Sequence, residues 1–99
     1  MPKIYTKSQR ADQDIKTITH RSLVDFGEEQ TDKYMAGMKA ALGSLAEHPT
    51  IGRSFTHEKT RLAYLYFRYV SHVVYYRQRK NDILIVRILH IKMLPEQHL

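Results

Sequence analysis

Residues 61–90 read RLAYLYFRYVSHVVYYRQRKNDILIVRILH, and this stretch decides the fold. Aromatic and β-branched residues dominate it, which favours extended strands over helix. A break is expected between Arg68 and Ser71, and the polar KND sequence at 80–82 is typical of a turn. The stretch therefore predicts three consecutive antiparallel strands, the last of them at 83–90.

The residues before this stretch have the spacing of two helices. Apolar and small residues recur there at steps of three and four, which predicts one buried face on each helix. Ser8 can cap the first helix with its hydroxyl, Gly27 supplies a left-handed stop, and Pro49 cannot continue the second helix. The residues predicted to face inward are Ala11, Ile15, Ile18, Ser22 and Phe26, then Tyr34, Met38, Ala41, Leu42 and Leu45.

The remaining segments complete the order of elements. KIYT at 3–6 alternates weakly and predicts a short first strand, whereas the polar TIGRSFTHEKT at 50–60 predicts a loop. Gly37 and Gly43 weaken the second helix by about 1 kcal/mol each, but small residues also allow another element to approach closely. We therefore expect one α+β domain over residues 1–99, ordered β-α-α-β-β-β, with a helical hairpin packed on a small, mainly antiparallel sheet.

The chain has no cysteine and carries a net charge of +6, and both features limit the classes of protein to which it can belong. No apolar run at the N-terminus suits a signal peptide, and no stretch is long enough to span a membrane, so we expect a cytoplasmic protein. The charge is unevenly placed, because residues 51–99 hold nine basic against three acidic side chains while the first half is balanced. Such a one-sided excess points to an anionic partner, either nucleic acid or an acidic protein segment.

Histidines and arginines are the residues that could carry chemistry. The six histidines show no ligand spacing, so we predict no metal site and no cofactor. RNA cleavage through the 2′-hydroxyl needs a base, an acid and cations to stabilise the phosphorane. The arginines at 61, 68, 77 and 87 could supply the cations, with His72 or His90 moving the protons. A histidine at a strand end is nevertheless more often a hydrogen-bonded structural residue.

Tyrosines interleave with the arginines of the strand region. Five of the seven tyrosines lie between residues 64 and 76. Aromatic faces beside guanidinium groups can stack nucleic-acid bases, and tyrosine and arginine are also enriched in protein interfaces. The pattern predicts a binding surface and leaves its ligand open.

Several short motifs at these separations resemble one known family. They are ADQDIKTI (11–18), FGEEQTDKYMAGMKAAL (26–42), LAEHPTIGR (45–53), HVVYYR (72–77) and IVRILHIKM (85–93), followed by a terminal HL. Together they resemble the ParE branch of the RelE/ParE superfamily, the toxins of bacterial type II toxin–antitoxin pairs. The resemblance spans nearly the whole chain.

The resemblance implies a compact toxin that poisons DNA gyrase by binding and that a ParD-like antitoxin neutralises. The C-terminal segment of the antitoxin would wrap the toxin, and operator DNA would be bound only through the antitoxin complex. We expect target contacts from Arg61, Arg68, Arg77, Arg87, His90 and Met93. We expect antitoxin contacts at exposed apolar positions, namely Ile15, Ile18, Tyr34, Met38, Tyr64, Tyr66 and Tyr75.

Two alternatives remain from the sequence. RelE-type relatives cleave mRNA on the ribosome, and a ribonuclease here would use Arg61, Arg77, Arg87 and His90. The tail HIKMLPEQHL has no tyrosine, and the strands at 61–79 have no carboxylate, so the catalytic groups common in RelE-like nucleases are missing. We therefore favour binding without catalysis. The second alternative is a non-toxic remnant that serves only as an antitoxin partner.

Overall fold

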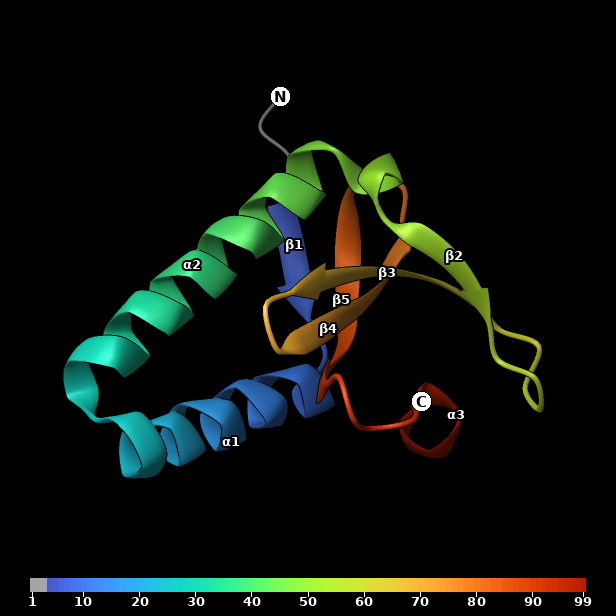
Figure 1. The fold of residues 1–99 in the computed structure, drawn as a ribbon. Coiled ribbons are helices and arrows are strands. Elements are labelled where there is room, and N and C mark those ends of the chain that lie inside the picture. The colour runs from blue at the N-terminus through green and yellow to red at the C-terminus, as the bar shows by residue number, and fades with distance from the viewer. Residues whose placement is uncertain (1–3) are drawn as a thin grey trace.

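The computed structural model describes residues 4–99, so Lys3, the first residue of the predicted first strand, lies outside the described residues. The elements are β1 (Ile4–Lys7), α1 (Gln9–Phe26), α2 (Glu28–Glu47), the 3₁₀ turn η1 (Pro49–Ile51), β2 (Arg53–Thr56), β3 (Ala63–Tyr69), β4 (His72–Gln78), β5 (Asp82–His90) and α3 (Pro95–His98). The five strands form one sheet in the order β1-β5-β4-β3-β2 (Figure 1). The pairing of β1 with β5 is parallel and the other three pairings are antiparallel. The predicted α+β fold is confirmed.

The helix ends lie where the sequence places them. The Ser8 hydroxyl accepts a hydrogen bond from the Ala11 amide at 3.0 Å, which satisfies one orphan donor of the first turn. Gly27 has φ of +84° and alone joins α1 to α2, so only a residue without Cβ fits there comfortably. The two helices diverge from this turn, and the connection between β3 and β4 faces the space between them (Figure 1).

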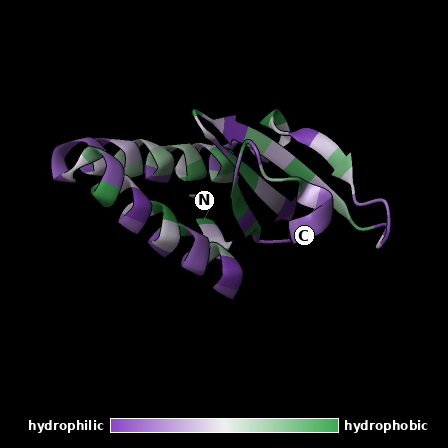
Figure 2. Cartoon of the chain, turned by 60° about the horizontal axis from the view of Figure 1, so that its bottom comes forward, coloured by the Kyte–Doolittle hydropathy of each residue, from purple (hydrophilic) through white to green (hydrophobic). Residues whose placement is uncertain are grey.

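The core lies between the helices and one face of the sheet. Met38, Leu42 and Leu45 of α2 pack against strand residues such as Val74 and Ile85, all nearly inaccessible to solvent. Hydrophobic and hydrophilic residues alternate along the elements in Figure 2, as expected where each has one buried face.

Close approach at Gly37 is part of this packing. A Cβ at this position would collide with the Tyr69 hydroxyl, which donates a 2.9 Å hydrogen bond to the Tyr34 carbonyl. At Gly43, by contrast, a Cβ would meet no atom within 4 Å. The expected role of small residues in α2 is therefore confirmed at Gly37 alone.

The structure corrects the predictions in three places. Part of the predicted loop at 50–60 is the edge strand β2, in which Phe55 pairs with Tyr64. The mostly polar sequence of β2 gave no strand signal. Phe26, predicted to face inward, is 63% exposed because it is the last residue of α1, where the helix has already diverged from the sheet. The short helix α3 follows Leu94 and was not predicted. Among residues 4–99, no helix is long and apolar enough to cross a membrane.

Candidate functional site

A groove of about 750 Å³ opens between α1, the start of α2, the β3–β4 connection and the end of β5. We call it the hairpin groove. Its apolar lining includes Ile18, Phe26, Val70, Ile88 and Met93. Its polar lining includes Tyr34, His72 and His90, and its charged lining consists of Asp14, Arg21, Asp25 and Lys92. The fold thus brings Ile18 and Tyr34, expected to contact an antitoxin, together with His90 and Met93, expected to contact a target.

Two histidines lie side by side in the hairpin groove because of the strand register. His72 begins β4 and His90 ends β5, and these residues are paired across the ladder. Their ring centres are 5.4 Å apart and their planes nearly perpendicular. The Tyr34 hydroxyl lies 2.7 Å from His72 Nδ1, and the backbone N–H of Lys92 donates to His90 Nδ1 at 3.1 Å. Each ring is therefore fixed through Nδ1.

The environment of His72 keeps its imidazole neutral. Burial, and to a smaller extent the adjacent His90, lower the pKa of His72 from 6.5 to about 4. The pKa of Tyr34 is raised, chiefly by burial, so its hydroxyl keeps its proton. At neutral pH the pair Tyr34–His72 is thus an uncharged hydrogen-bonded unit.

Arg87 is bound within the fold. Its Nε and Nη2 donate to the two carboxylate oxygens of Asp14 at 2.8 and 2.9 Å, and its Nη1 donates to the carbonyl of His98 at 2.8 Å. Asp14 also accepts from the amide of Ile88 at 3.0 Å. Because the two side chains are only 11% and 14% exposed, little of the Arg87 guanidinium is accessible, and the expected contact of Arg87 with a target stays a prediction.

The opposite face of the sheet carries an aromatic cluster that we call the tyrosine face: Phe55, Tyr64, Tyr66 and Tyr75. Their ring centres are 6.1 to 6.3 Å apart along the chain of contacts. Tyr64 and Tyr75 are only 7% and 6% exposed, and Met38, in the core on the other side, is 1% exposed. These three residues are therefore not the exposed positions at which the sequence predicted antitoxin contacts, and their contact with an antitoxin stays a prediction. Tyr66, Ile15, Ile18 and Tyr34 remain partly accessible.

The other arginines expected at a target are exposed but scattered. Arg77 lies over the Tyr64 ring at 5.9 Å, and Arg68 donates to the carbonyl of Val70 at 2.8 Å. Arg61 has φ of +63° in the loop before β3. Neither Arg61 nor Arg77 lines the groove that contains His90. The residues expected to form a ribonuclease centre are thus not gathered in one place.

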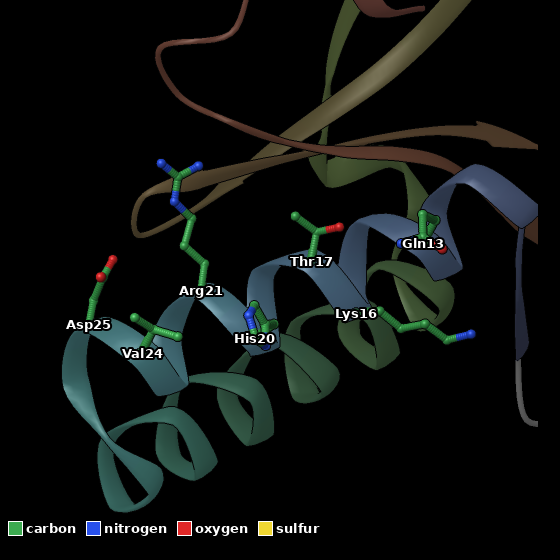
Figure 3. A pocket seen from close by; sticks show the side chains of 7 residues that line it. All are labelled: Gln13, Lys16, Thr17, His20, Arg21, Val24 and Asp25. Atoms are coloured by element: carbon green, nitrogen blue, oxygen red, sulfur yellow. The ribbon is translucent and has the colours of Figure 1, made fainter.

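A shallower depression of about 570 Å³ runs along α1 (Figure 3). All seven of its lining side chains, from Gln13 to Asp25, come from this one helix. A furrow without a second wall offers little enclosure to a ligand. Among the described residues, no group of three or more histidine or acidic side chains could hold a metal ion.

Comparison with known proteins identifies the family. The model of the ParE toxin of type II toxin–antitoxin system, parDE, matches residues 5–95. The chain belongs to the ParE toxin family. It is 35% identical over 97 residues to Toxin ParE1 of Caulobacter vibrioides (strain ATCC 19089 / CIP 103742 / CB 15), which covers 98% of both chains. A chain in the solved structure of the chromosomal ParDE TA system from P. aeruginosa shares the fold, with a TM-score of 0.72 and 18% identity over 92% of this chain and 98% of that chain.

Sequence reasoning missed one buried polar residue of this ParE toxin. His57 is 3% exposed; its Nδ1 accepts from the amides of Lys59 and Thr60 at 3.2 Å, and its Nε2 lies 3.1 Å from the Glu96 carbonyl. Because Nδ1 accepts, Nε2 carries the proton and donates to that carbonyl. His57 therefore ties the loop before β3 to the C-terminal helix α3. The lone histidine in a polar segment gave no signal of this role.

Proposed function

We propose that this ParE toxin inhibits growth by binding DNA gyrase in the cytoplasm and stabilising its cleaved DNA complex. Family membership supports this proposal, and so does the placement of charge. Arg61, Arg68 and Arg77 are exposed, and Arg77 lies over the Tyr64 ring of the tyrosine face. Guanidinium groups presented in this way suit a surface that carries DNA phosphates. Binding without bond cleavage is favoured because the candidate ribonuclease residues lie apart.

A gyrase cleavage assay tests the proposal. Toxin is incubated with gyrase, ATP and supercoiled plasmid, then with detergent and protease. Linear DNA is the expected product, and Arg68→Ala and Arg77→Ala should reduce it while Lys39→Ala, a matched change on exposed α2, should not. Absence of linear DNA with gyrase otherwise active would refute the gyrase assignment, and cleavage of mRNA on ribosomes would establish the ribonuclease alternative.

We further propose that the hairpin groove holds the C-terminal segment of a ParD-like antitoxin. The single observation that carries this part is the groove itself, a concave surface with apolar walls built by both helices and the sheet. A segment with one apolar side would bury those walls, as amphipathic segments do in comparable grooves. Operator DNA would be bound only by the assembled complex.

Val70→Glu tests the groove. Val70 is 59% exposed and lines the groove at the β3–β4 connection, so a charge there should leave folding intact and oppose an apolar segment. We expect weaker antitoxin binding by calorimetry, whereas Val24→Glu, on the outer face of α1, should bind as the wild type does. Equal affinities for the two variants would place the antitoxin elsewhere.

A further inference from the structure

The proton on His90 is located by its backbone contact. His90 Nδ1 accepts the N–H of Lys92, so its lone pair is occupied. In a neutral imidazole one nitrogen accepts and the other donates. His90 Nε2 therefore carries the proton.

The position of the proton on His72 depends on where the hydroxyl hydrogen of Tyr34 points. The Tyr34 hydroxyl already accepts from the Ser71 amide at 3.3 Å, and its own hydrogen can go to His72 Nδ1 at 2.7 Å or to the Tyr69 carbonyl at 3.5 Å. A length of 2.7 Å is typical of a hydrogen bond donated by a hydroxyl and short for one donated by a ring N–H, so the hydroxyl is the donor in this contact. Tyr34 therefore donates to Nδ1, and His72 Nε2 carries the proton.

Both Nε2–H groups are free and accessible. Neither forms a hydrogen bond with another residue among positions 4–99. No buried side-chain nitrogen or oxygen in the same range lacks a partner, so these two atoms must reach solvent. Both rings line the hairpin groove with their centres 5.4 Å apart. Two donors without an acceptor thus belong to adjacent rings that line the groove.

We propose that His72 and His90 form a two-donor clip that binds one carboxylate, carried by an aspartate or glutamate side chain of the antitoxin segment in the hairpin groove. This inference rests on the proposed function, because it names the chemistry of the partner at that site. Hydrogen bonds to an ionised oxygen are shorter and roughly twice as strong as neutral ones. Tyr34 is a positioning residue, since its hydroxyl selects the tautomer of His72 that donates.

The surroundings of the clip favour a carboxylate on a protein over a phosphate of nucleic acid. The charged lining residues are two acids and two bases, Asp14 and Asp25 with Arg21 and Lys92, so the groove has no strong positive field. Nucleic-acid sites are much more basic than this. Apolar walls with a single anion-binding point instead suit an amphipathic peptide with one acidic residue.

Acetate titration of the isolated full chain, followed by NMR of the histidine ring nitrogens, tests the clip without any partner. We expect saturable shifts at His72 and His90, and none at the exposed His20 and His48, with chloride at equal ionic strength as the control. Tyr34→Phe should weaken acetate binding and redistribute the His72 proton between its nitrogens. Shifts of equal size at all four histidines, or tighter binding of inorganic phosphate than of acetate, would overturn the inference.

Binding to the antitoxin then separates the clip from the proposed function. His72→Phe and His90→Phe should each weaken the complex about ten- to a hundredfold, the effect of losing one hydrogen bond to a charged group. Changing the antitoxin acid to its amide should weaken the complex more than either single histidine variant, and should cause no further loss once both histidines are replaced. If wild-type toxin forms no complex, the proposed function fails. If it does and both variants bind equally well, the clip alone fails.

Discussion

The pairing of Asp14 with Arg87 makes a sharp prediction about an arginine that sequence alone assigns to target binding. Replacing Arg87 with methionine keeps most of the side-chain volume and removes the charge. The Asp14 carboxylate, 14% exposed, then keeps only the Ile88 amide as a partner, and the His98 carbonyl loses its donor. We expect the main effect to be on the free energy of unfolding.

The magnitude follows from the burial of the pair. Removing one partner of a buried ion pair costs about 3–5 kcal/mol, and the remaining exposure places Arg87→Met at the lower end, about 3 kcal/mol. Asp14→Asn keeps one acceptor oxygen and should cost about 2 kcal/mol. The double variant should lose about 1–2 kcal/mol less than the two single losses together, since no unpaired charge remains.

Thermal and urea unfolding of the three variants measure these values. For a domain of this size about 3 kcal/mol lowers Tm by roughly 10–20 °C. Lys33→Met, which breaks an exposed pair with Glu29, is the control and should change Tm little. Arg87→Met that unfolds like the wild type yet no longer acts on gyrase would refute this reasoning and make Arg87 a direct contact.

Three further predictions concern packing and protonation. Gly37→Ala should destabilise the protein by about 1–2 kcal/mol because the new Cβ displaces the Tyr69 hydroxyl. Gly43→Ala, where a Cβ meets no atom within 4 Å, should stabilise it by about 0.5–1 kcal/mol. Urea unfolding of both variants checks this, and equal effects would contradict it. The pKa of His72 is about 4 in the folded protein and 6.5 in the unfolded chain, so the unfolded chain binds the proton first as pH falls. The free energy of unfolding should therefore decrease between pH 6.5 and pH 4. The loss at pH 5 should be about 1 kcal/mol after allowing for the partial exposure of His72. Urea unfolding at pH 7 and 5 measures that loss, and His72→Phe should lack it. Tyr76→Phe removes a buried hydroxyl that bonds a carbonyl at 2.7 Å and an amide at 3.0 Å, and should cost about 1–3 kcal/mol by the same assay.

The fold could be predicted wherever the signal is local. The Ser8 cap, the Gly27 stop and the aromatic strands each act over a few residues, and all lie where the sequence places them. The edge strand β2 could not be predicted in the same way. Its four residues have little apolar content and become a strand only because β3 offers an unpaired edge.

The site is built from residues that are far apart in the chain. The sequence therefore identified several of these residues, but not which of them contact one another. His72 and His90 were candidates as separate proton carriers, but only the register of β4 and β5 places their rings together. Asp14 and Arg87 are separated by 73 residues, and nothing near either one announces the pair. Met38, Tyr64 and Tyr75 are residue types that are common in interfaces. The packing of the fold nevertheless buries all three side chains.

The parallel pairing of β1 with β5 determines when this protein can fold. β5 occupies the sheet between β1 and β4, and it is the last strand to be synthesised. While a ribosome is still translating β5, β1 has no strand to pair with, and the hydrogen bond from Arg87 to the His98 carbonyl has not yet formed. Pairings so far apart in the chain also form slowly. A nascent chain of this toxin therefore reaches its native state only after β5 has left the ribosome, and a message truncated before β5 yields no folded product.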